Sequence, residues 1–185
     1  RHKEQLAFCN FTPHTDFLIT SSVDGFVKFW KKVTGGIEFV KEFKAHTGEI
    51  KSVSVSADGR SYATAGADGT VKIFDVVNFD LLAMLEPELP PKCVCFVNGS
   101  ASSDVTLAVS NETDGRIMMY DGRGEIQPPL HTISGLHRKP VNLMAYNNAF
   151  DCVISTDDSG MVEYWRPSGS YEKPPNVFDM RSSTS

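Results

Sequence analysis

Histidine, hydroxyl and aspartate side chains recur along the chain, and these are the residue types that a hydrolase combines for nucleophilic catalysis. One such set is His46, Thr64 and Asp68. A catalytic nucleophile is needed once, exposed on a sharp turn. Because related sets begin at His2 and His137, the repetition favours buried structural clamps over an active site.

Each set belongs to a hairpin signal that occurs four times. Its glycines are Gly25, Gly69, Gly115 and Gly160, at intervals of 44, 46 and 45 residues. A turn residue and glycine between short runs of β-branched and aromatic residues predict a tight hairpin, here a type I′ turn with positive φ at both central residues. The period is typical of propeller blades.

Further columns appear when the repeats are aligned on this turn. An aromatic follows each turn, at Trp30, Phe74, Tyr120 and Trp165, and a hydroxyl precedes it, at Thr20, Thr64, Ser110 and Ser155. A histidine precedes three of the four, with Lys92 in its place in the third. Buried polar groups at such fixed positions must satisfy one another.

The columns resemble the hydrogen-bond tetrad of the WD-repeat family, and the resemblance covers essentially the whole chain. It implies structural tetrads built from His2, Thr20, Asp24, Trp30, His46, Thr64, Asp68, Ser110, Asp114, His137, Ser155 and Trp165. Three repeats depart from the pattern. Phe74 cannot donate, the third repeat has no histidine, and Ser159 replaces the fourth aspartate, for which Asp157 or Asp158 is a candidate substitute.

The predicted fold is all-β, a propeller segment of four blades with four antiparallel strands each. The expected units are residues 1–43, 44–86, 87–134 and 135–173, followed by a polar tail or the start of another blade at 174–185. WD propellers are typically rings of seven blades, and an open arc leaves unpaired edges. The chain is therefore expected to be a fragment of a larger ring.

Composition narrows the functional classes. The net charge of -5 has no basic block, which disfavours binding through phosphate neutralisation. No apolar run is long enough to span a bilayer and no secretory signal is seen, so an intracellular, soluble protein is expected. The cysteines lack metal-ligand or disulfide spacing, although Cys93 and Cys95 share a strand face and could contribute to a soft-metal site. No metal or cofactor is predicted.

Several segments are more specific than the general repeat, among them residues 25–32, 36–41, 74–80, 120–124 and 159–165. They resemble the propeller of the cyclophilin-type peptidyl-prolyl isomerases that carry WD repeats. The resemblance implies a nuclear protein of the spliceosome whose isomerase domain is missing here, so this chain is expected to be non-catalytic and to bind spliceosomal proteins. The alternative is a general WD adaptor of chromatin or ubiquitin-ligase complexes.

Arginine and aromatic residues in loops are the predicted protein-binding positions, because interface anchors favour these types. They are Arg60, Phe79, Arg116, Arg123 and Arg138. No small-molecule substrate is expected. Lysines of the first two repeats, with Phe29 and Phe43, raise the alternative of an RNA-facing strip, but interspersed glutamates favour a solvated outer face.

Overall fold

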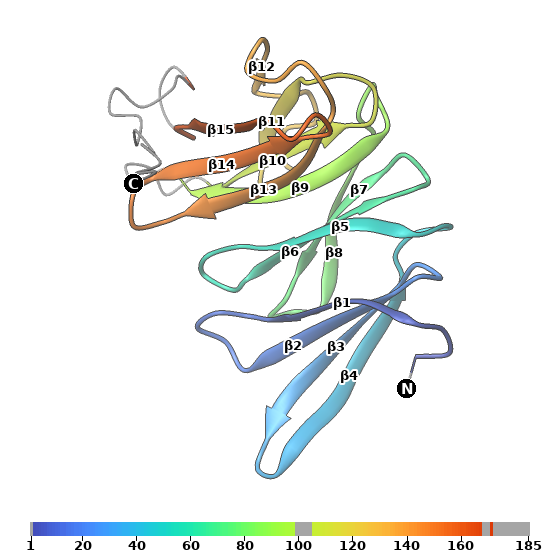
Figure 1. Ribbon diagram of the computed structural model, residues 1–185. Coiled ribbons are helices and arrows are strands. Elements are labelled where there is room, and N and C mark those ends of the chain that lie inside the picture. The colour runs from blue at the N-terminus through green and yellow to red at the C-terminus, as the bar shows by residue number, and fades with distance from the viewer. Residues whose placement is uncertain (1, 99–104, 168–170, 172–185) are drawn as a thin grey trace, which may run out of the picture.

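The computed structural model describes residues 2–98, 105–167 and 171, and in these parts the chain is entirely β-structure, with four antiparallel sheets in chain order (Figure 1). The first contains β1 (Leu6–Phe11), β2 (Phe17–Ser22), β3 (Phe26–Val33) and β4 (Gly36–Lys44). The second contains β5 (Ile50–Val55), β6 (Ser61–Gly66), β7 (Val71–Asp75) and β8 (Asp80–Leu85).

The third sheet contains β9 (Pro91–Asn98), β10 (Val105–Asn111), β11 (Ile117–Asp121) and β12 (His131–Ile133). The fourth has three strands within the described residues, β13 (Val141–Asn147), β14 (Cys152–Asp157) and β15 (Val162–Trp165). The all-β prediction is confirmed. The expected tail at 174–185 lies outside the described residues.

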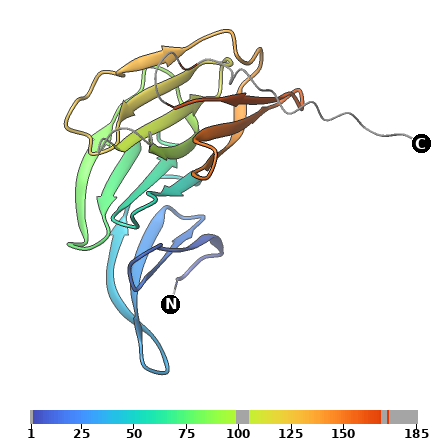
Figure 2. The same cartoon turned by 90° about the vertical axis from the view of Figure 1, so that its left-hand side faces the viewer.

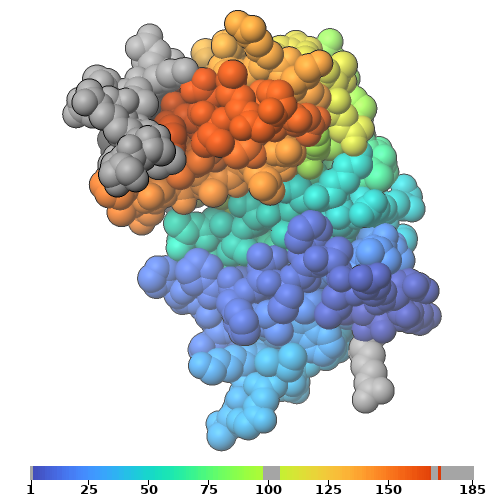
Figure 3. Space-filling model, viewed as in Figure 1, coloured from blue at the N-terminus to red at the C-terminus, as the bar shows by residue number. Residues whose placement is uncertain are grey.

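The hydrophobic core is divided between successive sheets, which stack as layers with the light-blue β3–β4 hairpin projecting from one end (Figure 3). Phe29 and Tyr62 pack between the first and second sheets, and Leu107 packs between the second and third. Trp165 is fully buried between the third and fourth. Strands β2, β6, β10 and β11 therefore bury both of their faces over most of their length, as in stacked blades.

The hairpin turns were predicted correctly in place but not in type. Gly25, Gly69 and Gly160 have positive φ, whereas the residues before them do not. The N–H of Gly25 donates to the carbonyl of Ser22 at 3.0 Å, which makes the glycine the last residue of the turn. This is the type I turn followed by a left-handed residue, so the type I′ prediction is wrong. Gly115 does not have positive φ.

The third hairpin also has a longer connection than the others. In the first, second and fourth hairpins the last paired residues of the two strands are separated by five residues, 22–26, 66–70 and 157–161. In the third hairpin they are separated by six residues, 111–116. This insertion shifts Ser110 by one position relative to Thr64. Because side chains alternate along a strand, Ser110 faces away from the position that Thr64 occupies in its sheet.

The alternation of strand direction sorts the connections into two rims. One, here called the histidine rim, holds the links between sheets together with the turns after β2, β6, β10 and β14. The opposite rim holds the turns after β1, β3, β5, β7, β11 and β13. The first strands of the sheets, β1, β5, β9 and β13, follow one another along one side of the stack of sheets, in which each contacts the next. Figure 2 shows this stack from the side.

Candidate functional site

The second sheet holds a complete histidine clamp apart from its aromatic member. His46 Nδ1 lies 2.9 Å from Asp68 Oδ1, and its Nε2 lies 2.8 Å from Thr64 Oγ1. Because a carboxylate only accepts, Nδ1 carries the proton and Thr64 donates to Nε2. Gly66 makes the approach possible, since a Cβ there would lie 2.1 Å from His46 Nδ1. Phe74 has no donor and packs in the core.

The first sheet inserts a hydroxyl into the same arrangement. His2 Nδ1 lies 2.8 Å from Ser22 Oγ, and Ser22 in turn donates to Asp24 at 2.5 Å. His2 Nε2 lies 2.8 Å from Thr20 Oγ1, which also accepts from Trp30 Nε1 at 2.7 Å. The direct contact between His2 and Asp24 implied by the family resemblance is therefore replaced by a relay through Ser22.

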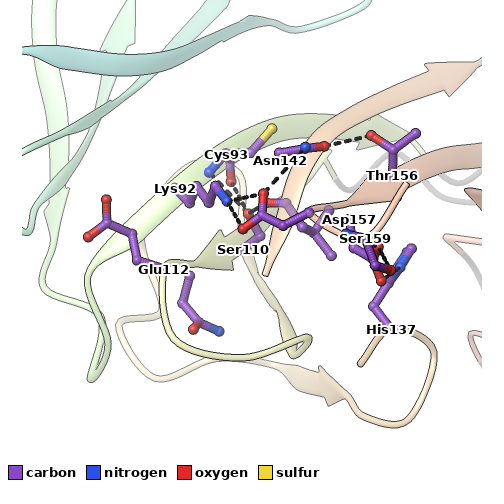
Figure 4. A network of polar contacts seen from close by, with 12 residues as sticks. Lys92, Cys93, Ser110, Glu112, His137, Asn142, Thr156, Asp157 and Ser159 are labelled. Atoms are coloured by element: carbon purple, nitrogen blue, oxygen red, sulfur yellow. Dashed lines mark hydrogen bonds and ion pairs between the residues drawn. The ribbon is translucent and has the colours of Figure 1, made fainter. Parts of the chain in front are cut away.

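The fourth sheet exchanges the serine and the aspartate (Figure 4). Asp157 occupies the hairpin position of Ser22, and Ser159 that of Asp24. His137 Nδ1 lies 3.2 Å from Asp157, and Ser159 donates to Asp157 at 2.5 Å. His137 Nε2 lies 2.7 Å from Ser155, which accepts from Trp165 Nε1 at 3.2 Å. Asp157, rather than Asp158, thus supplies the carboxylate.

The third sheet lacks a clamp, and the shifted Ser110 serves another purpose. It donates to the carbonyl of Val141 at 2.8 Å and accepts from the N–H of Cys93 at 3.0 Å, linking the third and fourth sheets. Asp114 accepts from Asn111 at 2.9 Å and pairs with Arg116 at 2.8 Å. The structure does not bring Ser110 and Asp114 together, because the longer turn separates them.

Burial decides what the clamps can do chemically. His46 is 1% exposed and Thr64 is fully buried, so a substrate has no access to the Thr64 hydroxyl. Burial lowers the pKa of His46, although Asp68 acts to raise it. Burial acts to raise the pKa of Asp68, but hydrogen bonds from His46, Thr70 and the Thr47 N–H hold it well below its usual range. A neutral histidine beside a carboxylate, closed to solvent, is a structural element.

The buried cysteines have a similar structural role. Burial raises the pKa of Cys93, and it raises that of Cys95 to about 12, so neither forms the thiolate that a metal or a nucleophilic reaction needs. The Cys93 sulfur instead accepts a hydrogen bond from the Ser52 hydroxyl at 3.6 Å. Within the described residues no group of three or more histidine, cysteine or acidic side chains is placed to hold a metal ion.

The predicted protein-binding residues are divided between the rims. Arg116 and Arg138 lie on the histidine rim, where Arg116 is tied to Asp114. Arg60 and Arg123 are exposed on the opposite rim. Phe79 is also at that rim but does not stand free, since it packs edge-on against Phe17 with ring centroids 5.1 Å apart and joins the core between the first two sheets. Phe79 is thus only partly exposed, and its role as a binding anchor stays a prediction.

The alternative of an RNA-facing lysine strip depends on Phe29 and Phe43 being accessible. Phe29 is fully buried, and Phe43 packs against the same core. Lys28 is mostly buried and pairs with Glu42 at 2.9 Å. Lys41 pairs with Asp80 on the second sheet at 3.3 Å. Lys28 and Lys41 are thus engaged in ion pairs, and the ring of Phe29 is not accessible for a base to stack on.

Sequence reasoning missed a pair of ion bridges that join neighbouring sheets at the histidine rim. Lys51 at the start of β5 pairs with Glu112 in the turn of the third sheet at 2.6 Å. Lys92 at the start of β9 pairs with Asp158 in the turn of the fourth sheet at 2.6 Å. Glu112 and Asp158 occupy the same position in their turns, and Lys51 and Lys92 occupy the same position in the strands of the preceding sheets. An alignment of the repeats that compared these acidic and basic positions would have shown both pairs.

Comparison with known sequences and folds agrees with this geometry. The WD domain, G-beta repeat model matches residues 1–31 and 37–75. The WD40 domain of Sif2 superposes with a TM-score of 0.71 at 18% identity, over 88% of this chain and 43% of that one. The computationally designed Ika4 protein gives 0.70 at 19% identity, over 90% and 93%. The repeat model thus matches the first two sheets, and the four antiparallel sheets together have the fold of a WD40 propeller segment.

Among curated proteins, the chain is similar to peptidyl-prolyl isomerases with WD repeats. It is 43% identical to peptidyl-prolyl cis-trans isomerase cyp15 of Rhizopus delemar over 91% of its length. It is 46% identical to human peptidylprolyl isomerase domain and WD repeat-containing protein 1 over 88%, and 35% identical to peptidyl-prolyl cis-trans isomerase 9 of Schizosaccharomyces pombe over 99%. The chain spans 27%, 25% and 30% of these proteins. Among the residues that the structure describes, there is no helix long and apolar enough to span a membrane.

Proposed function

We propose that this chain is a non-catalytic protein-binding scaffold, the WD-repeat portion of a nuclear cyclophilin-type peptidyl-prolyl isomerase associated with pre-mRNA splicing. The observation that carries the scaffold part is the contrast between the buried clamps and the exposed rims. His46 is bound by Thr64 and Asp68 inside the fold, and His137 by Ser155 and Asp157. The side chains of Arg60, Arg123 and Arg138 are instead exposed to solvent. A stack of sheets held in this way presents loops at fixed positions for docking.

The similarity to isomerases with WD repeats supports the more specific part of the proposal. A scaffold joined to an isomerase domain would hold that domain near proline-containing segments of a bound partner and raise their effective concentration. The spliceosomal partners and the nuclear location follow from the family resemblance. Their support is the sequence similarity alone.

The proposal is tested by mass spectrometry of nuclear proteins retained on the immobilised chain. The expected result is enrichment of splicing proteins, lost with Arg123→Ala and kept with the matched loop variant Gly36→Ala, whose added Cβ meets no atom within 4 Å. Enrichment of histones or ubiquitin-ligase subunits instead would favour the alternative adaptor function. Enrichment of RNA-dependent material only, lost after nuclease treatment, would contradict direct protein binding.

A further inference from the structure

The three interfaces between successive sheets are built in the same way. In each, a row of residues that runs across the first three strands of one sheet packs against the preceding sheet, and it is here called the receiving row. In the second sheet it consists of Val55, Tyr62 and Phe74, which lie opposite one another in the strand register. The corresponding rows are Phe96, Leu107 and Tyr120 in the third sheet and Tyr146, Val153 and Trp165 in the fourth.

The surface that packs on each receiving row is repeated as well. It lies on the second and third strands of the preceding sheet, on the face that points toward the row, and is here called the covering set. Its members are Ile19, Val27 and Phe29 in the first sheet, Ala63, Val71 and Ile73 in the second, and Ala108, Ile117 and Met119 in the third. All of these residues are 0% exposed. The fold thus forms one kind of apolar interface three times.

The first sheet has a receiving row that no preceding sheet covers within the part of the chain that the structure describes. Phe11, Leu18 and Trp30 pair with one another in the same register as the rows of the other sheets. Phe11 is 78% exposed, whereas Phe96 at the matching position is 4% exposed. Trp30 is part-exposed, whereas Trp165 is fully buried. This row is built like the other three but is open to solvent.

The fourth sheet presents the other half of the interface. Ile154, Val162 and Tyr164 hold the positions of a covering set, with Ile154 opposite Tyr164 in the register. Val162 is 50% exposed, whereas Val27 at the same position of the first sheet is 0% exposed. Ile154 and Tyr164 are part-exposed. Among the described residues no following sheet covers this set.

We propose that a second copy of this chain docks on these two faces, with the covering set of the fourth sheet of one copy against the receiving row of the first sheet of the other. The occupant is a second copy because each open face matches the other in residue type and position, as the two halves of the three internal interfaces do. None of the six residues is charged, so the contact buries no unpaired charge. Removal of these apolar side chains from water favours association.

The proposed contact joins two different surfaces. Contacts of this kind form rings when the rotation between copies closes, and open chains when it does not. Two copies of four sheets each combine the number of sheets found in the larger known propellers, which have four to eight blades. The expected assembly is therefore a closed pair in which both interfaces are formed.

Sedimentation velocity measured over a range of chain concentrations tests the proposal. We expect monomers in dilute solution and a species of twice the monomer mass in concentrated solution. The fluorescence of Trp30 should shift to shorter wavelength over the same range, since Trp165, the other tryptophan, is already buried. Monomers at every concentration, or polymers that keep growing as the concentration rises, would overturn the closed pair.

Phe11→Asp and Val162→Asp each place a charge in one of the two faces. Both side chains are exposed in the single chain, so the melting temperature in dilute solution should change little. Each substitution should weaken association by about tenfold or more, because the new charge would be buried in the contact. Ile126→Asp, at a 49% exposed side chain between β11 and β12, is the matched control and should associate like the unchanged chain.

A mixture of the two variants distinguishes the proposed contact from a symmetric one. The Phe11→Asp chain keeps its fourth sheet intact and the Val162→Asp chain keeps its first, so the mixture should form pairs through a single interface although neither variant associates alone. If only one of the two variants lost association, identical faces would be docking on each other. If neither lost it, the contact would lie elsewhere. Either result would overturn the pairing of the first sheet with the fourth.

Discussion

Ser22 and Asp157 occupy the same position in their hairpins, and each lies against Nδ1 of the histidine that precedes its sheet. In the first sheet the Ser22 hydroxyl lies between the histidine and Asp24, to which it donates. In the fourth sheet the Asp157 carboxylate contacts the histidine directly and accepts a hydrogen bond from Ser159. The same three groups, imidazole, hydroxyl and carboxylate, are thus connected in two different orders.

This exchange predicts that the two arrangements are interchangeable. Asp157→Ser alone leaves His137 without a carboxylate, and Ser159→Asp alone places two carboxylates side by side. Each single variant should therefore lower the melting temperature by several degrees. The double variant reproduces the arrangement of the first sheet and should melt above both singles. Differential scanning calorimetry measures this, and strict additivity of the two losses would contradict the exchange.

Gly66 should be intolerant of any side chain. An alanine Cβ would lie 2.1 Å from His46 Nδ1 and 2.7 Å from Asp68 Oδ1, so the clamp must break or move. Overpacking and loss of a buried hydrogen-bond network predict a destabilisation of about 2 kcal/mol or more. Urea unfolding of Gly66→Ala is the measurement. Gly36→Ala, which meets open space, should unfold like the unchanged chain.

Acidification should weaken the fold in two stages. The pKa of His46 is lowered by burial below its ordinary 6.5, so the unfolded chain binds a proton more readily and stability falls as the pH drops below about 6.5. The pKa of Asp68 is also lowered, so its contribution is present above about pH 4 and is lost as the pH falls further.

Urea midpoints measured between pH 7 and pH 5 test the first stage. His46→Gln should show a lower midpoint at pH 7 and a flatter dependence on pH over this window. His14→Asn, at an exposed turn, serves as the control and should keep the slope of the unchanged chain. An unchanged slope in His46→Gln would contradict the role given to burial of the imidazole.

The inter-sheet ion pairs should contribute little by themselves. Lys51–Glu112 and Lys92–Asp158 are partly exposed, and such pairs typically couple by about 0.2–1 kcal/mol and are screened by salt. A double-mutant cycle with Lys92→Met and Asp158→Asn should give a coupling in this range that shrinks at 1 M salt. A coupling that persists in high salt would show that the two groups interact by something other than charge.

The blades and two of the clamps could be predicted from sequence because they depend on local signals. Turn glycines, a hydroxyl and an aromatic at fixed spacing locate the hairpins, and His46 and Asp68 meet as the column suggests. Ser22 was overlooked because it is not a member of the repeated columns, although in the first sheet it lies between His2 and Asp24. Ser110 was misplaced because one inserted residue reverses the face of a strand.

The rims were harder to predict because exposure there depends on neighbouring sheets. Phe79 has the type of an interface anchor, but the adjacent first sheet supplies Phe17 and Phe29 as packing partners. Arg116 has the same type but its guanidinium is bound to Asp114 in its own turn. The recess lined by Asn10, Val55, Phe96 and Tyr146 forms only when four strand ends that are distant in sequence come together.

The account separates residues that hold the fold from residues that bind partners, and one comparison tests this most directly. Retention of nuclear proteins is measured for Arg123→Ala and for the double variant Asp157→Ser with Ser159→Asp, at a temperature where both are folded. The account predicts that Arg123→Ala loses retained proteins at an unchanged melting temperature, while the double variant retains them. Equal retention by Arg123→Ala and the unchanged chain, or loss of retention in the folded double variant, would contradict it.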